Sequence, residues 1–80
     1  MEKLRSIVYV QYKDGSKPKG IRVKLNIKGG IFSGGFTNDF YTDRDGRVII
    51  EHISKGEAEV YVGGKKVGVF KVPGETVVFI

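Results

Sequence analysis

Apolar and polar residues alternate along most of the chain with the two-residue period of a β-strand. The clearest run covers residues 21–28, in which every second side chain is branched and apolar and the residues between them are polar. A helix would scatter the two sets around its circumference, so this run predicts a half-buried strand. Its polar face carries a basic stripe, formed by Arg22, Lys24 and Lys28.

Six further segments are rich in strand-forming residues, and Asp-Gly, Gly-Gly or Pro-Gly turn signals separate several of them. No window has the period of a helix. The sequence therefore predicts one all-β domain over residues 1–80, a small antiparallel β-sandwich of seven strands. The predicted strands cover residues 4–12, 21–28, 37–42, 47–53, 57–62, 65–72 and 76–80.

The inward faces of three of these strands predict the centre of the core. The turn before residues 47–53 has the sequence Asp-Arg-Asp-Gly, so we expect a tight turn from Asp43 with a positive φ at Gly46. Gly63 and Gly64 predict a two-residue hairpin. The residues expected to be buried are Val23, Leu25, Val48, Ile50, Val60 and Val62.

The segment from Gly29 to Phe36 holds four glycines and two phenylalanines in eight residues. Such a glycine content is unfavourable to order. Two interpretations stay open at this point. The segment is either a binding loop that presents Phe32 and Phe36 to a ligand, or a hairpin or bulged strand whose phenylalanines cap the core.

Composition limits the chain in three ways. The 80 residues include no cysteine, so neither disulfides nor thiolate metal sites can stabilise the fold, and burial of its apolar residues must do so. The net charge of +5 is typical both of proteins that bind anionic surfaces and of soluble domains with lysine-rich strand edges. No run approaches the ~20 apolar residues of a membrane span, and the charged N-terminus lacks a signal peptide, which favours a cytoplasmic chain over a trimmed piece of a larger protein.

Three stretches resemble the transthyretin-like, carboxypeptidase regulatory-like domain. They are Gly20 with Val23 and Leu25, then Thr42-Asp43-x-x-Gly46-x-Val48-x-Ile50, then Ile53-x-x-Gly56-x-Ala58-x-Val60-x-Val62. The resemblance implies a seven-stranded, immunoglobulin-like sandwich of the prealbumin type. It also implies an accessory or binding module, often attached to larger extracellular or periplasmic proteins and usually without catalytic residues.

Residues that carry chemistry are few. His52 is the only histidine, and the nearby Ser54 is not part of a nucleophile motif. Asp39, Asp43 and Asp45 do not match the ligand spacing of a calcium loop. We therefore expect no enzyme activity, no catalytic residues, no metal and no cofactor.

The sequence favours a non-catalytic binding or structural module whose partner is a protein or a larger parent assembly. The alternative is a small basic β-barrel that binds single-stranded nucleic acid. The two hypotheses predict different topologies. We expect a sandwich to place the terminal strands in different sheets, whereas a barrel closes. The candidate contact residues are Phe32, Phe36, Tyr41, Tyr61, Arg22, Lys24 and Lys28.

Overall fold

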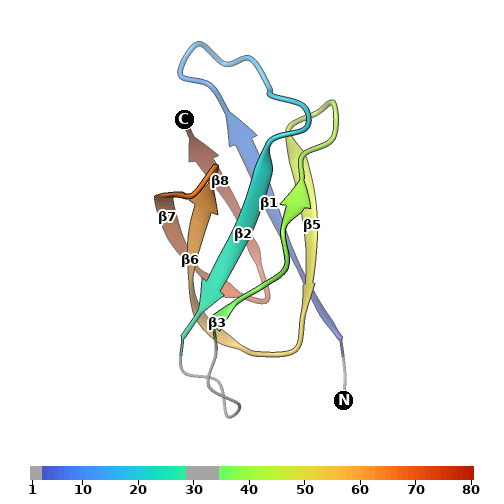
Figure 1. Cartoon of the computed structure of the whole chain (residues 1–80), viewed down its shortest axis with the longest axis vertical. Helices are drawn as coiled ribbons and strands as arrows, with labels where there is room; N and C mark the ends of the chain where they lie inside the picture. The colour runs from blue at the N-terminus through green and yellow to red at the C-terminus, as the bar shows by residue number, and fades with distance from the viewer. Residues whose placement is uncertain (1–2, 29–34) are drawn as a thin grey trace.

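Eight β-strands form two sheets in the computed structural model, which describes residues 3–28 and 35–80 (Figure 1). Those two ranges contain no helix, and hence no helix that could cross a membrane. The strands are β1 (Leu4–Gln11), β2 (Arg22–Ile27), β3 (Gly35–Phe36), β4 (Phe40–Tyr41), β5 (Arg47–His52), β6 (Gly56–Val62), β7 (Lys65–Val72) and β8 (Glu75–Phe79).

The two sheets confirm the predicted all-β sandwich. One sheet has the order β5-β1-β8; the other has β6 between β2 and β7, and both short strands β3 and β4 pair with the opposite edge of β2. In β1, β2 and β5, every second side chain is buried between the sheets. All six residues predicted for the core are at most 7% exposed, and Val8, Val10, Ala58, Val72 and Val78 join them.

The terminal strands do not follow the expected topology. We expected them in different sheets of an antiparallel sandwich, but β1 and β8 are neighbours in one sheet and run parallel. The Pro73-Gly74 turn carries the chain from β7 to the other sheet, where the Ile7 amide donates a hydrogen bond to the Gly74 carbonyl oxygen (2.9 Å). This contact starts β8 beside the middle of β1, which fixes the parallel register.

The predicted strand over residues 37–42 is interrupted. Within it only β4 forms a strand; Thr37 to Asp39 are irregular, and β3 lies just before them. The Thr37 hydroxyl oxygen accepts the Leu25 amide hydrogen (3.0 Å), a bond that a backbone carbonyl would accept in a regular ladder. A regular strand would place Phe36 and Phe40 on one face. Because of this break they lie on different faces: Phe40 packs against the core, whereas Phe36 is 57% exposed.

The turn between β4 and β5 has the predicted geometry. Gly46 has a φ of +71°, and its amide donates to the Asp43 carbonyl oxygen (3.0 Å). One oxygen of the Asp43 carboxylate accepts hydrogen bonds from the Arg47 and Asp45 amides at 3.0 and 2.8 Å. The bond from the Arg47 amide is the main reason why the Asp43 pKa is lowered. Asp43 therefore serves the turn.

Candidate functional site

Cations and aromatic rings meet on the outer face of the sheet formed by β2, β3, β4, β6 and β7. The register places Tyr41 of β4 opposite Arg22 and Tyr61 of β6 opposite Lys24. Phe36 of β3 lies opposite Asn26, one outward position further along β2. We call this surface the basic–aromatic face and define it by Arg22, Lys24, Lys28, Phe36, Tyr41, Tyr61 and Lys66.

Contacts across three strands hold the centre of this face. The Phe36 and Tyr61 ring centroids are 5.2 Å apart, with an interplanar angle of 64°, so the rings meet edge to face. The Lys24 ammonium nitrogen lies 4.6 Å from the Phe36 ring centroid, within the range of a cation–π interaction. Phe36 is thus exposed yet held in a defined position between a cation and a second ring.

Glu59 forms ion pairs with two lysines of the same face. Its side chain is only 10% exposed, and one carboxylate oxygen lies 2.8 Å from the Lys66 nitrogen and 3.2 Å from the Lys28 nitrogen. The other oxygen accepts a hydrogen bond from the Asn26 amide group (3.0 Å). These three partners, Lys66 first, lower the pKa of Glu59 to about 2, and the carboxylate in turn raises the pKa of Lys66.

The Glu59 cluster predicts an acid-sensitive contribution to stability. Since the pKa of Glu59 is about 2 in the fold and near 4.5 when unperturbed, its stabilising effect is complete above pH 4.5 and is lost as the pH falls toward 2. Glu59→Gln is therefore expected to lower the melting temperature at pH 7 and to have little effect near pH 2, as measured by circular dichroism. Glu57→Gln, at the exposed outward position before it on β6, is the matched control. An equal loss for Glu59→Gln at both pH values would contradict this role.

Six of the seven candidate contact residues lie on the basic–aromatic face. The seventh, Phe32, falls outside the described residues, as does the rest of the stretch 29–34. On any single strand the aromatic residues do not alternate with the basic ones, but neighbouring strands bring Phe36 and Tyr61 to Lys24.

Sequence reasoning missed the link that Glu59 makes between Lys28 and Lys66. The alternation in β6 already puts Glu59 and Tyr61 on one face of the sheet. Only the pairing of β6 with β2 and β7 shows which residues surround them, because those partners come from distant parts of the sequence.

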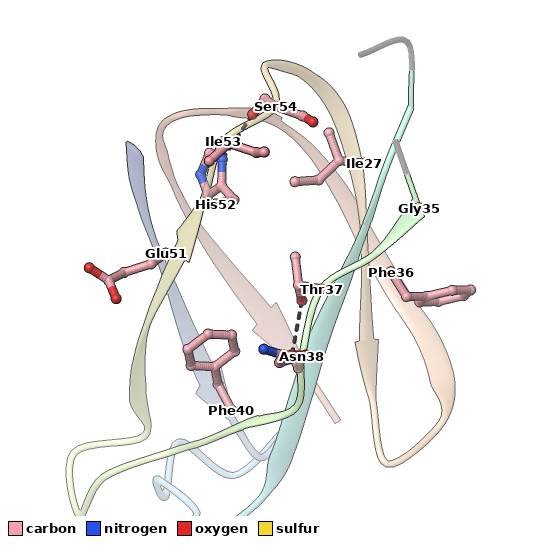
Figure 2. A pocket seen from close by; sticks show the side chains of 10 residues that line it. All are labelled: Ile27, Gly35, Phe36, Thr37, Asn38, Phe40, Glu51, His52, Ile53 and Ser54. Atoms are coloured by element: carbon pink, nitrogen blue, oxygen red, sulfur yellow. Dashed lines mark hydrogen bonds between the residues drawn. The ribbon is translucent and has the colours of Figure 1, made fainter. Parts of the chain in front are cut away.

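A second feature is a cleft of about 360 Å³ between the β3–β4 stretch and the end of β5. Figure 2 shows the Phe40 ring, the His52 imidazole and the Ile53 side chain around this cleft, whereas the Phe36 ring points away to the other side of the sheet. The Glu51 carboxylate is directed outward. The cleft therefore mixes apolar side chains such as Ile27 and Phe40 with polar ones such as Thr37 and Asn38, and it has one imidazole at its wall.

His52 is the histidine at the wall of the cleft, and both of its ring nitrogens are engaged. Nδ1 lies 2.8 Å from the Ser54 carbonyl oxygen, which can only accept, so Nδ1 carries the proton. Nε2 then accepts from the Ser6 hydroxyl (2.7 Å), whose oxygen also receives the Gly74 amide hydrogen (3.2 Å). These hydrogen bonds link β1, β5 and the β7–β8 turn. Because Ser6 is fully buried, its hydroxyl is not accessible as a nucleophile.

No family model, curated protein or solved structure matches this chain. Among residues 3–28 and 35–80, no group of three or more histidine, cysteine, aspartate or glutamate side chains is placed to hold a metal ion.

The outer face of the β5-β1-β8 sheet differs in character from the basic–aromatic face. It exposes the apolar side chains of Ile49, Val77 and Phe79 by 45–57%. The pairing of β1 with both neighbours sets Ile7 and Tyr9 between them. The molecule thus has one outer face rich in cations and aromatic rings, and one on which exposed apolar side chains lie among charged ones such as the Arg5–Glu51 ion pair.

Proposed function

We propose that this protein is a non-catalytic binding module that contacts its partner through the basic–aromatic face. The observation that carries the proposal is the Lys24–Phe36–Tyr61 cluster, in which an exposed ring is held in place by a cation and a second ring. Exposed aromatic side chains are frequent anchors in interfaces, because they bury a large area with few rotatable bonds. The resemblance to transthyretin-like accessory domains points to the same class of function.

The partner best suited to this face is a protein surface that combines acidic and apolar groups. Glu59 forms ion pairs with Lys28 and Lys66. Arg22 and Lys24 form none of the ion pairs found among the described residues. Carboxylates of a partner would bind these two cations, which lie beside the 61% exposed Tyr41 ring and the Phe36 ring. A face of this kind provides aromatic anchor residues at its centre and charged groups that orient the partner.

A second candidate function is binding of single-stranded nucleic acid. It is favoured by one specific observation: rings and cations alternate across β3, β2 and β6. Proteins that bind single strands likewise combine aromatic stacking surfaces with cations that contact phosphates. Few cations are available, however, since Glu59 neutralises part of the face. We therefore expect binding to be weak at physiological salt and steeply dependent on salt concentration.

Site-specific photo-crosslinking in cells tests the proposed function. The crosslinker p-benzoylphenylalanine replaces Tyr41 in one variant and Val77, on the opposite sheet, in the matched control. We expect a discrete adduct with a protein from position 41 but not from position 77, and we expect Phe36→Ala to reduce that adduct at least several-fold. An adduct that nuclease removes would favour the nucleic-acid candidate. Adducts from position 77 alone would contradict the proposal.

The nucleic-acid candidate has its own prediction. Fluorescence anisotropy with a labelled single-stranded oligonucleotide should show binding that disappears as salt rises, with a logarithmic slope near −0.7 per phosphate contact. Sub-micromolar affinity at physiological salt that falls when Tyr61 becomes alanine would make nucleic acid the better assignment. Stacking on this ring would then account for roughly 1–3 kcal/mol per base.

A further inference from the structure

A second cavity, of about 520 Å³, opens at the end of the sandwich opposite the His52 cleft. It is bounded by the β6–β7 hairpin, the start of β2 and the end of β8, which come together near the C-terminus in Figure 1. Its apolar lining includes Ile21, Val67 and Ile80, which are partly buried and pack against the core. Phe79, itself 57% exposed, adds a ring to this lining.

Two lysines line this largely apolar cavity. Lys13 follows β1 and Lys65 begins β7, and both are exposed residues of the cavity wall. Neither takes part in the ion pairs found among residues 3–28 and 35–80. The acidic residue next to Lys13, Asp14, is engaged elsewhere, since its carboxylate accepts the amide and hydroxyl hydrogens of Ser16 at 2.9 and 2.7 Å. The cavity thus combines an apolar floor with two cations that lack a carboxylate partner within the described part of the chain.

We propose that this cavity binds a small amphipathic carboxylate, with the alkyl chain on the apolar floor and the carboxylate between Lys13 and Lys65. The volume lies within the roughly 300–1,000 Å³ of small-molecule sites. Apolar lining with a few charged groups at one side is the arrangement that orients such a ligand. The two ammonium groups favour an anionic head group, and the partly buried aliphatic side chains favour an apolar tail.

Titration with hexanoate, octanoate and decanoate, each below its micelle concentration, tests the proposal by two-dimensional NMR. We expect the largest shifts at Ile21, Val67 and Ile80. We also expect affinity to rise with chain length by up to about fourfold per methylene, the factor that corresponds to ~0.8 kcal/mol. The double variant Lys13→Gln/Lys65→Gln should weaken decanoate binding at least fivefold. The matched control is Lys19→Gln/Lys71→Gln, which removes two exposed lysines away from the cavity.

Three results of the titration would overturn the proposal. They are equal binding of decylamine and decanoate, unchanged affinity in the Lys13→Gln/Lys65→Gln variant, and shifts confined to Ile49 and Val77, which lie on the outer face of the β5-β1-β8 sheet away from the cavity. Binding only to vesicles that contain phosphatidylglycerol, with none to free decanoate, would also overturn it. The basic–aromatic face plays no part in this titration, so its outcome is independent of the proposed function.

Discussion

Replacing Ile50 with alanine is expected to lower the free energy of unfolding by about 2–5 kcal/mol. Ile50 has no exposed surface and lies on the inward face of β5, among the largest fully buried side chains of the core. The truncation removes apolar contacts and leaves a cavity that the surrounding strands cannot fill completely. Since small domains have about 5–15 kcal/mol of stability in total, this is a large share.

Urea unfolding followed by circular dichroism measures this effect. Ile49→Ala is the matched control, because it removes the same atoms from the preceding residue of β5, whose side chain is 45% exposed on the outer face. We expect the control to lose much less stability than Ile50→Ala. Equal losses for the two variants would contradict the inward assignment of Ile50.

The second large effect is expected at Gly46. Its φ of +71° is unfavourable for any residue with a Cβ, and an added Cβ would overlap the carbonyl oxygen of Val10. That oxygen belongs to the backbone of β1, where the Val10 amide donates to the Gly46 carbonyl oxygen (2.8 Å). Gly46→Ala is therefore expected to destabilise the fold by about 3 kcal/mol or more, since the backbone must move.

Gly20 provides a control that separates backbone conformation from steric overlap. Its φ of +72° matches that of Gly46, but an added Cβ would have no heavy atom within 4 Å. Gly20→Ala should therefore show only the cost of the left-handed conformation, about 1–2 kcal/mol. Thermal and urea unfolding of the two variants give the comparison. If Gly20→Ala destabilised as much as Gly46→Ala, contact with Val10 would not be the cause.

Much of the sandwich was predictable because its signals are local. The alternation around Val23 and Leu25, and around Val48 and Ile50, identifies the inward faces without knowledge of the partner strands. The positive φ at Gly46 follows from the Asp-Gly turn in the same way. Each of these features depends on residues within one strand or one turn.

The interrupted strand shows where local signals fail. Residues 37–42 have the composition of a strand, and nothing in the sequence marks Thr37 as the acceptor for the Leu25 amide. That bond breaks the alternation, so Phe36 turns outward and Phe40 inward. The parallel pairing of β1 with β8 was missed for a similar reason, because it depends on a contact between Ile7 and Gly74.

The sequence by itself determined the strand faces, the tight turns and the basic stripe of β2, since these follow from the side-chain period and from glycine conformation. Only the tertiary structure decided which residues meet: Phe36 with Lys24 and Tyr61, Glu59 with Lys28 and Lys66, and Ser6 with His52. The reason is physical. A side chain's direction depends on its own backbone, whereas its neighbours across a sheet depend on pairing between segments far apart in the chain.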